Sequence, residues 1–180
     1  MNARPGIGGE MAMAQEAAVP PERFKQAMRH LAGTACVITV AQGGVRSGLT
    51  ATSVVPVAAE PAEVLVAVNQ SSSSWPLLAG SRRFGVNLLS AAQQRLAMQF
   101  AGVGGCKGEA RYAGHDWLEA AEGIWLLRQA SAALACEVAD VWVRHSHALV
   151  IGRVTAIHMG AEPEASPLLY WQGQFGRFES

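Results

Sequence analysis

Short runs of β-branched and aliphatic residues, separated by turns, limit the possible fold of this chain more than any other feature. Strand-like runs cover residues 35–41, 45–55, 63–69, 83–89, 131–143 and 147–159. The turn "QGG" joins the first two runs into a hairpin. The runs do not alternate with long helices as in a parallel sheet, and no GxGxxG follows a strand. The sequence therefore predicts a mainly β fold with short helices, in which an antiparallel sheet closes into a barrel or sandwich.

Helical patterns are few and short. After Pro20, the apolar residues Phe24, Met28 and Leu31 recur at helical spacing, and Gly33 is expected to end this helix. Two further helices are expected over 71–80 and 90–102, and a long loop rich in glycine and polar residues over 102–123. The stretch 167–178 follows the last strand-like run and is assigned no secondary structure. Residues 1–19 lack any periodicity and are predicted to be a disordered tail, which leaves 20–180 as one domain.

Composition excludes several classes of partner. Fourteen basic residues balance fourteen acidic ones, so nothing indicates bulk attraction to nucleic acid or to an anionic membrane. No apolar run approaches the ~20 residues that span a bilayer, and the opening residues lack the apolar core of a signal peptide. Cys36, Cys106 and Cys136 show no CxxC spacing and are expected to be free thiols, which suits the cytoplasm.

The stretch "GLTATS" is unusually small and polar for a strand. Gly48 and Ala51 would let a flat ligand lie close to the backbone, and Thr50, Thr52 and Ser53 carry hydroxyl groups that could bond it. The alternative is an ordinary strand, since threonine favours β structure. On this stretch alone the ordinary strand is the stronger interpretation.

The stretch "NQSSSSWP" places four serines at the entrance of a predicted helix. Their hydroxyl and backbone N–H groups, together with the positive end of the helix dipole, can hold a phosphate. The alternative is a solvated loop with a helix cap.

Two histidines lie close together in "VRHSHALVIG". His145 and His147 are two residues apart, which would put both on one face of a strand. A metal site needs a third and a fourth ligand, and the sequence offers no clear ones, so no metal is predicted. A strand histidine that faces a pocket, at His147, is the favoured interpretation, and a half-buried polar position is the alternative.

Taken in order, these stretches resemble the short-chain flavin reductase family, whose members supply reduced flavin to two-component monooxygenases. The similar segments span about residues 22–178 and read "FKQAMRHLAGTACVITV", "GLTATSVVPVAAEPAEVLVAVN", "NQSSSSWPLL", "RFGVNLLSAAQQRLAMQFAG", "SHALVIGRV" and "PLLYWQGQFGRF". The sequence departs from the family pattern at Ser146, where Asp or Thr is frequent, and at Tyr112, which replaces a phenylalanine.

The resemblance implies an FMN-binding split β-barrel that forms a homodimer, with flavin near the subunit interface. It implies hydride transfer from NADH or NADPH to FMN or FAD, with His147 on the nicotinamide side. Reduced flavin would reach a monooxygenase partner by diffusion. The flavin contacts that it implies are Gly48, Thr50, Ala51, Thr52, Ser53, Asn69, Gln70, Ser71, Ser72, Ser74, Phe100, Ala101, Arg111, Tyr112, Trp171 and Phe175.

Two other functions remain open at this point. The same barrel could carry flavin or haem without turnover. It could also serve an enzyme similar to pyridoxamine-phosphate oxidase, which would need a basic cluster for the substrate phosphate. Arg82, Arg83 and Lys107 could contribute to such a cluster, but they are not assembled in the sequence.

Overall fold

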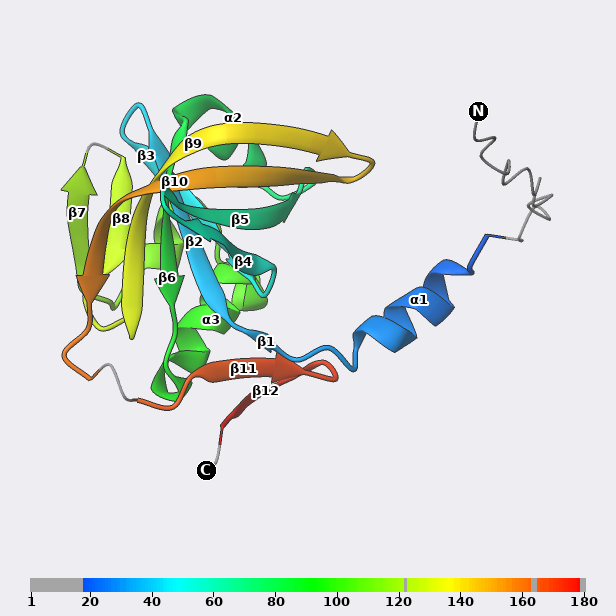
Figure 1. Cartoon of the computed structure of the whole chain (residues 1–180). Coiled ribbons are helices and arrows are strands. Elements are labelled where there is room, and N and C mark those ends of the chain that lie inside the picture. The colour runs from blue at the N-terminus through cyan, green and yellow to red at the C-terminus, as the bar shows by residue number, and fades with distance from the viewer. Residues whose placement is uncertain (1–17, 122, 163–164, 179–180) are drawn as a thin grey trace, which may run out of the picture.

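The structure is a computed structural model, and it describes residues 18–121, 123–162 and 165–178. The tail predicted for residues 1–19 therefore lies, up to residue 17, outside the described residues. Antiparallel pairing joins seven strands into one sheet with the order β3-β2-β6-β9-β10-β5-β4 (Figure 1). Their bounds are β2 Cys36–Gln42, β3 Val45–Ala51, β4 Val54–Ala59, β5 Ala62–Asn69, β6 Arg83–Leu88, β9 Ala132–Arg144 and β10 His147–Met159.

The sheet closes because its two edge strands are adjacent in the sequence. β3 ends at Ala51 and β4 begins at Val54, a separation that a fully extended chain spans in at most about 11 Å. At this corner Ser53 Oγ donates to the carbonyl oxygen of Ala67, 2.8 Å away on β5. A mainly antiparallel β fold is thus confirmed, but the predicted strand over 45–55 is wrong as one unit, because the chain changes sheet edge at residues 52–53.

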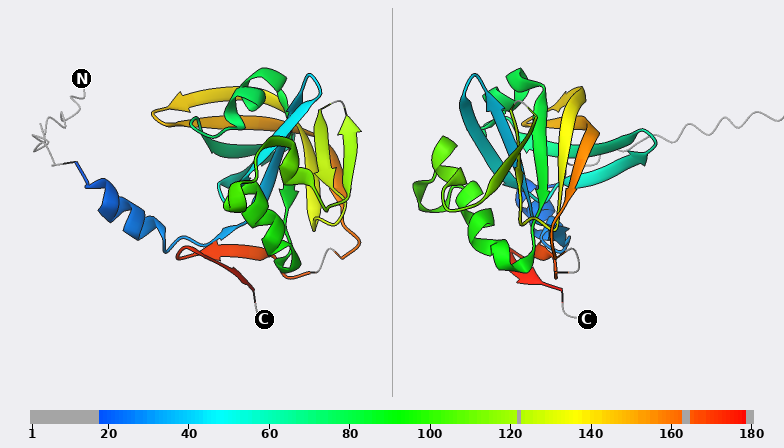
Figure 2. Two further views of the ribbon diagram at one scale, coloured as in Figure 1. Left: turned by 180° about the vertical axis from the view of Figure 1, so that it is seen from behind. Right: turned by 90° about the vertical axis from the view of Figure 1, so that its left-hand side faces the viewer.

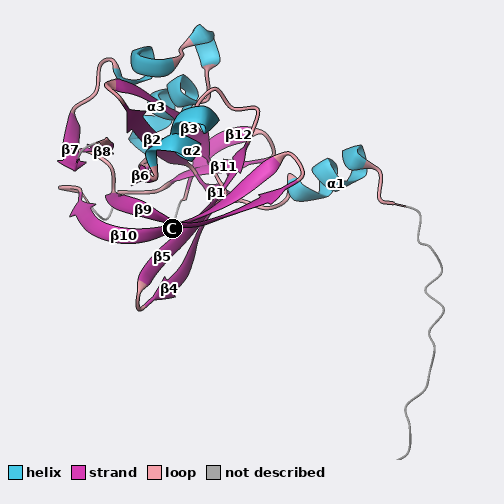
Figure 3. Cartoon of the chain, turned by 90° about the horizontal axis from the view of Figure 1, so that it is seen from above, coloured by secondary structure: helices cyan, strands magenta, loops and turns pink. Residues whose placement is uncertain are grey.

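Smaller elements surround the barrel. A three-stranded sheet pairs β1 with β11 and β11 with β12, and β7 pairs with β8. The remaining elements are α1 Pro21–Met28, β1 Gly33–Thr34, α2 Trp75–Ser81, η1 Ala91–Gln93, α3 Gln94–Phe100, η2 Val103–Gly105, η3 Gly108–Tyr112, β7 Trp117–Ala121, β8 Ile124–Leu127, β11 Leu168–Trp171 and β12 Gln174–Arg177. Helix α3 and the long β9–β10 hairpin lie on opposite sides of the molecule (Figure 2), and the β4–β5 hairpin projects from it (Figure 3).

Two apolar clusters form the core, and β2 contributes to both. Ile38 and Val40 point into the barrel beside Phe84 and Val66. Val37, the residue before Ile38, packs on the outer cluster with α3 and the β7–β8 hairpin. Alternate residues of a strand face opposite sides, so a strand buried on both faces reads as a continuous apolar run. This explains why "ACVITV" shows no polar alternation.

Three predicted boundaries need correction. The long loop expected over 102–123 contains two 3-10 helices and strand β7. Helix α2 passes Gly80 and ends at Ser81, followed by the C-cap Arg82, whose φ of 55° lies in the left-handed region. Helix α1 ends at Met28 rather than near Gly33.

Helix α1 extends away from the barrel, and none of its residues is buried (Figure 1). Its apolar residues Phe24 and Met28 are 57% and 46% exposed, and Leu31 just beyond is 72% exposed. The periodicity therefore predicted a helix correctly without predicting what its apolar face packs against. None of the described helices has the length and apolar character that crossing a membrane requires.

Candidate active site

A cleft of about 670 Å³ lies between the end of β3, helix α3 and the β11–β12 hairpin. None of the described residues that line it is charged, and its walls combine hydroxyl and amide groups with apolar surface. We call it the ring cleft; it is lined by Thr50, Thr52, Gln94, Met98, Ala101, Val103, Tyr170, Gly173, Gln174 and Phe175. Its volume and its mostly apolar walls with a few polar groups suit a flat heterocycle.

Both threonines of "GLTATS" line the ring cleft, but they differ in exposure and in hydrogen bonding. Thr50 Oγ1 donates to the carbonyl oxygen of Ala97 at 2.6 Å, so this hydroxyl ties β3 to α3 and keeps only acceptor capacity for a ligand. Thr52, beyond the end of β3, is exposed. Ala51 is buried among the barrel residues, and its side chain faces away from the cleft.

A second polar group lies at the end of β5, and we call residues 69–72 the serine turn. Asn69 Oδ1 accepts hydrogen bonds from the backbone N–H and the hydroxyl of Ser71, both at 2.9 Å. The N–H of Ser72 donates to the carbonyl oxygen of Asn69 at 3.0 Å. The turn therefore holds its own shape, with Ser71 exposed and Ser72 half-buried.

The β9–β10 turn lies beside the serine turn. Asn69 on β5 pairs directly with His147, the first residue of β10. Gln70 donates through its backbone N–H to Ser146 O and through Nε2 to His145 O, both at 2.9 Å. These bonds fix the position of the exposed His147 relative to the serine turn.

The expectation that His145 and His147 share a strand face is wrong. His145 has φ 52° and lies in the two-residue turn between Arg144 and His147, which pair with each other. Ser146 Oγ lies 3.0 Å from His147 Nδ1, so the residue that departs from the family pattern contacts the imidazole. Among the described residues, no three His, Cys, Asp or Glu side chains come together in a way that could hold a metal.

Ser53 links the end of β3, which borders the ring cleft, to β5, which ends in the serine turn. Its Oγ and its carbonyl oxygen both bond the backbone of Ala67, two residues before Asn69 on the same strand. Two residues of a strand span about 7 Å. A ligand of flavin size could therefore extend from the ring cleft to the serine turn.

A buried polar network supports β3 from behind. Arg111 Nη1 donates to the carbonyl oxygen of Gly48 and to Ser74 Oγ at 3.1 Å. Ser74, with no exposed surface, also donates to Gly48 O at 2.6 Å and lies 2.9 Å from Ser47 Oγ. Burial lowers the pKa of Arg111, and the guanidinium remains charged because its ordinary pKa is very high.

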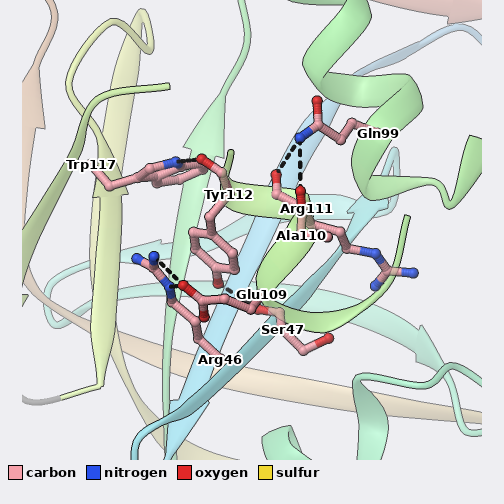
Figure 4. Close-up of polar contacts among 8 residues, drawn as sticks. All are labelled: Arg46, Ser47, Gln99, Glu109, Ala110, Arg111, Tyr112 and Trp117. Atoms are coloured by element: carbon pink, nitrogen blue, oxygen red, sulfur yellow. Dashed lines mark hydrogen bonds and ion pairs between the residues drawn. The ribbon is translucent and has the colours of Figure 1, made fainter. Parts of the chain in front are cut away.

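Gln99 of α3 holds the segment that carries Arg111. Its Nε2 lies within hydrogen-bond distance of the carbonyl oxygens of Ala110 and Arg111, at 3.1 and 3.0 Å (Figure 4). The carbonyl oxygen of Ala113 lies 3.2 Å from the same atom. The next residue, Tyr112, donates from its hydroxyl to Ser47 O at 2.5 Å. The segment therefore joins the C-terminal part of α3 to β3.

Arg46 closes the outer side of the same network. Its guanidinium lies 4.3 Å from the ring centroids of both Tyr112 and Trp125. It also pairs with Glu109, with 2.6 Å between Arg46 Nε and Glu109 Oε1 (Figure 4). This hydrogen bond is the main cause that raises the pKa of Arg46 and lowers that of Glu109.

The model of the flavin reductase-like domain matches residues 28–179. The chain belongs to the flavin reductase-like family. Its fold agrees with a solved flavin reductase domain protein from Arthrobacter, with a TM-score of 0.80 at 28% identity over 88% of this chain and 96% of that one. The split-barrel prediction is therefore confirmed.

Relatives in this family carry names that specify an activity. The chain is 34% identical to an NADH:riboflavin 5′-phosphate oxidoreductase of Streptomyces pristinaespiralis, over 88% of each chain. It is 30% identical to the 4-hydroxyphenylacetate 3-monooxygenase reductase component of Pseudomonas aeruginosa, over 88% of this chain and 92% of that one. A solved NADH:FAD oxidoreductase of Streptomyces globisporus, in complex with NAD and FAD fragments, has a TM-score of 0.79 at 25% identity, over 91% and 97% of the two chains.

Several residues that the family resemblance implied as flavin contacts lie beneath the site of this flavin reductase-like chain. Phe100 is 1% exposed and packs in the core against Tyr112 and Trp117. Ser74 and Arg111 bond to protein atoms, as described above. Ala101 and Phe175 line the ring cleft, whereas Trp171 lies in a neighbouring cleft.

Six residues of the ring cleft were missed by the sequence analysis. Two of them, Gln94 and Met98, precede the predicted Ala101 at spacings of four and three, so α3 presents one face to the cleft. That spacing was visible in the sequence, but it does not reveal which face looks toward β3. The others are Val103, Tyr170, Gly173 and Gln174.

Other reactive groups do not converge on this site. Burial raises the pKa of the Cys36 and Cys136 thiols to about 12, which leaves both unreactive as nucleophiles near neutral pH. Arg82, Arg83 and Lys107 do not line the ring cleft, and Arg83 pairs with Glu137 at 3.6 Å. The basic cluster that a pyridoxamine-phosphate substrate would need is therefore not present among the described residues of the cleft.

Proposed function

We infer that this chain is a nicotinamide-dependent flavin reductase that transfers hydride to FMN or FAD and supplies the reduced flavin to a monooxygenase. The observation that carries this function is the uncharged ring cleft at the end of β3, next to a corner where Ser53 bonds the strand that ends in the serine turn, in a chain that belongs to the flavin reductase-like family. We further propose NADH as the donor, since the similar reductases of known cofactor are named for it.

Hydride chemistry belongs to the flavin and the nicotinamide, and the protein positions them. In this proposal Thr50, Thr52 and the face of α3 hold the isoalloxazine ring in the ring cleft. The serine turn binds the flavin phosphate through its serine hydroxyls, because the backbone N–H groups of residues 70–72 already donate within the protein. Alignment of two rings is mainly a matter of orientation, so the site requires no acid–base triad.

Steady-state oxidation of NADH and NADPH, each with FMN, FAD and riboflavin, tests the function directly. We expect turnover that depends on added flavin and is faster with NADH. Flavin that co-purifies with the protein but is not reduced by either nicotinamide under anaerobic conditions would instead indicate a carrier. Cytoplasmic location is part of the proposal, since the three described cysteines are free thiols.

His147→Ala is expected to lower kcat about tenfold while changing the Kd for flavin less than about twofold, because the imidazole is assigned to the nicotinamide side. Ser146→Ala should give a smaller loss of the same kind, since Ser146 Oγ lies 3.0 Å from His147 Nδ1. Stopped-flow reduction and flavin titration give the two quantities. Equal losses in kcat and flavin affinity would mean that the histidine only supports the fold.

We also propose a homodimer, and the outer face of β9, β10, β5 and β4 supports it. Val55 on β4 and Trp142 on β9 are 52% and 56% exposed. Cross-strand pairing places both on the same sheet face as Leu149 and His147. Exposed apolar surface of this kind marks an interaction site, and here it adjoins the serine turn.

Val55→Asp is expected to convert the dimer to monomer at micromolar concentration, because a carboxylate would be buried without a partner at the interface. Val45→Asp is the matched control, since Val45 is 59% exposed on the other sheet edge. Sedimentation velocity distinguishes the two variants. A dimer that survives Val55→Asp would contradict the placement of the interface on this face.

A further inference from the structure

A second, smaller cleft adjoins the ring cleft. It has a volume of about 320 Å³ and lies between α1 and the turn of the β11–β12 hairpin. We call it the arm cleft. Thr52, Tyr170 and Gly173 line both clefts, so the two form one continuous surface.

The two clefts differ in charge. No charged side chain lines the ring cleft, whereas Lys25 and Arg29 line the arm cleft and no carboxylate does, among the described residues. Lys25 is already paired with Glu22, 2.8 Å away. No ion pair in the described part of the chain involves Arg29. The arm cleft therefore offers one uncompensated guanidinium beside an uncharged cleft.

Arg29 is held at the boundary between the two clefts. Its carbonyl oxygen accepts a hydrogen bond from the backbone N–H of Gln172 at 3.1 Å, which ties the end of α1 to the hairpin turn. A methyl group placed on Gly173 would lie 3.6 Å from Arg29 Nη2, so the guanidinium lies directly over this turn. Gly173 has φ 85°, a conformation that favours glycine, and its lack of a side chain leaves that space open.

Aromatic surface accompanies this charge. Phe24 and Trp171 both line the arm cleft and are 57% and 50% exposed. A guanidinium binds a phosphate through paired N–H donors, and exposed rings stack on a purine base. These are the two recognition elements that an ADP group requires.

We propose that the arm cleft binds the ADP portion of the hydride donor, with Arg29 on its pyrophosphate. This inference rests on the proposed function, because it assigns the donor of the same reaction. The uncharged nicotinamide end would then lie over the ring cleft, and the anionic end would lie against Arg29. Among the described residues that line the two clefts, Arg29 is the only cation without an ion-pair partner. Helix α1 would then be part of the substrate site rather than an appendage.

Arg29→Gln is the test, with Arg23→Gln on the same helix as the matched control, since Arg23 does not line the arm cleft. We expect Arg29→Gln to raise KM for NADH roughly five- to tenfold, the loss of one contact to a charged group, with kcat unchanged. The Kd of ADP-ribose, which carries the pyrophosphate without a nicotinamide, should rise by the same factor in calorimetry. Turnover with N-benzyl-dihydronicotinamide, which has no phosphate, should not change.

Three results would overturn the inference. ADP-ribose binding that is equal in wild type and Arg29→Gln would remove Arg29 from the site. Equal losses with NADH and the phosphate-free donor would show general damage to the fold. A loss confined to NADPH would place Arg29 on the 2′-phosphate instead of the pyrophosphate. Wild-type protein that oxidises no nicotinamide would defeat the proposed function, whereas the ADP-ribose titration tests the arm cleft independently.

Discussion

Ser72→Asp is expected to raise the KM for FMN about a hundredfold. Ser72 is half-buried in the serine turn, and its backbone N–H donates to the carbonyl oxygen of Asn69. Its hydroxyl oxygen accepts from the backbone N–H of Ser74, which leaves the hydroxyl hydrogen to donate to a ligand. A carboxylate at this position would lie within about 5 Å of the proposed phosphate. Two like charges at that distance repel by about 3 kcal/mol at an effective dielectric constant of ~20, which corresponds to about two orders of magnitude in affinity.

Riboflavin provides the internal control for this variant, because it has the ring and no phosphate. Its KM should be unchanged in Ser72→Asp, and Ser72→Asn should leave the KM of both flavins near wild type. The penalty with FMN should also shrink at high ionic strength, since a partly exposed charge pair is screened. A loss of equal size with riboflavin would refute the assignment of the serine turn to the phosphate.

Gly48→Ala is expected to destabilise the protein by about 1–3 kcal/mol and to weaken flavin binding at the same time. A methyl group at Gly48 would collide with the carbonyl oxygen of Ile38 and lie 2.6 Å from Cε1 of Phe100. Ile38 belongs to the paired strand and cannot move alone, so Phe100 and the rest of α3 must shift. Because α3 walls the ring cleft, the strain reaches the flavin site.

Gly176→Ala is the control for this prediction, since a methyl group there meets nothing within 4 Å and its φ is not in the left-handed region. Urea unfolding gives the change in stability, and flavin titration gives the change in affinity. A stable Gly48→Ala protein with weakened binding would restore the first interpretation of this glycine, in which the flavin ring itself approaches the backbone. Wild-type values for both would contradict the close packing of Phe100.

The sequence predicted the strands of the barrel well because each is a compact apolar run. β2, β5, β6, β9 and β10 agree with the predicted runs to within one or two residues. It did not predict the break at Thr52–Ser53, since both residues are compatible with an extended strand and only the closure of the sheet separates β3 from β4. Local pattern determines strand formation, whereas strand order depends on contacts between distant segments.

The candidate site shows the same division. The hydroxyl-rich stretches were visible as motifs, and in the structure Thr50 and Thr52 line the ring cleft while Ser53 bonds the strand that ends in the serine turn. The roles of Ser74 and Arg111 were not visible, because a buried side chain and a ligand-binding side chain carry the same polar groups. Their hydrogen bonds to Gly48 join segments far apart in sequence, and the spacing of residues along the chain does not indicate such contacts.

The corner at Thr52–Ser53 has a consequence for how this chain can vary. The β2–β3 turn has two glycines with open space around them, and an inserted residue there would only lengthen a hairpin. An insertion between β3 and β4 would lengthen the link that closes the barrel and would also move Thr52 in the ring cleft. These two residues close the barrel, and one of them, Thr52, also lines the proposed flavin site. We therefore expect the substrate range of such a reductase to be more easily altered from α3 and the C-terminal hairpin than from this corner.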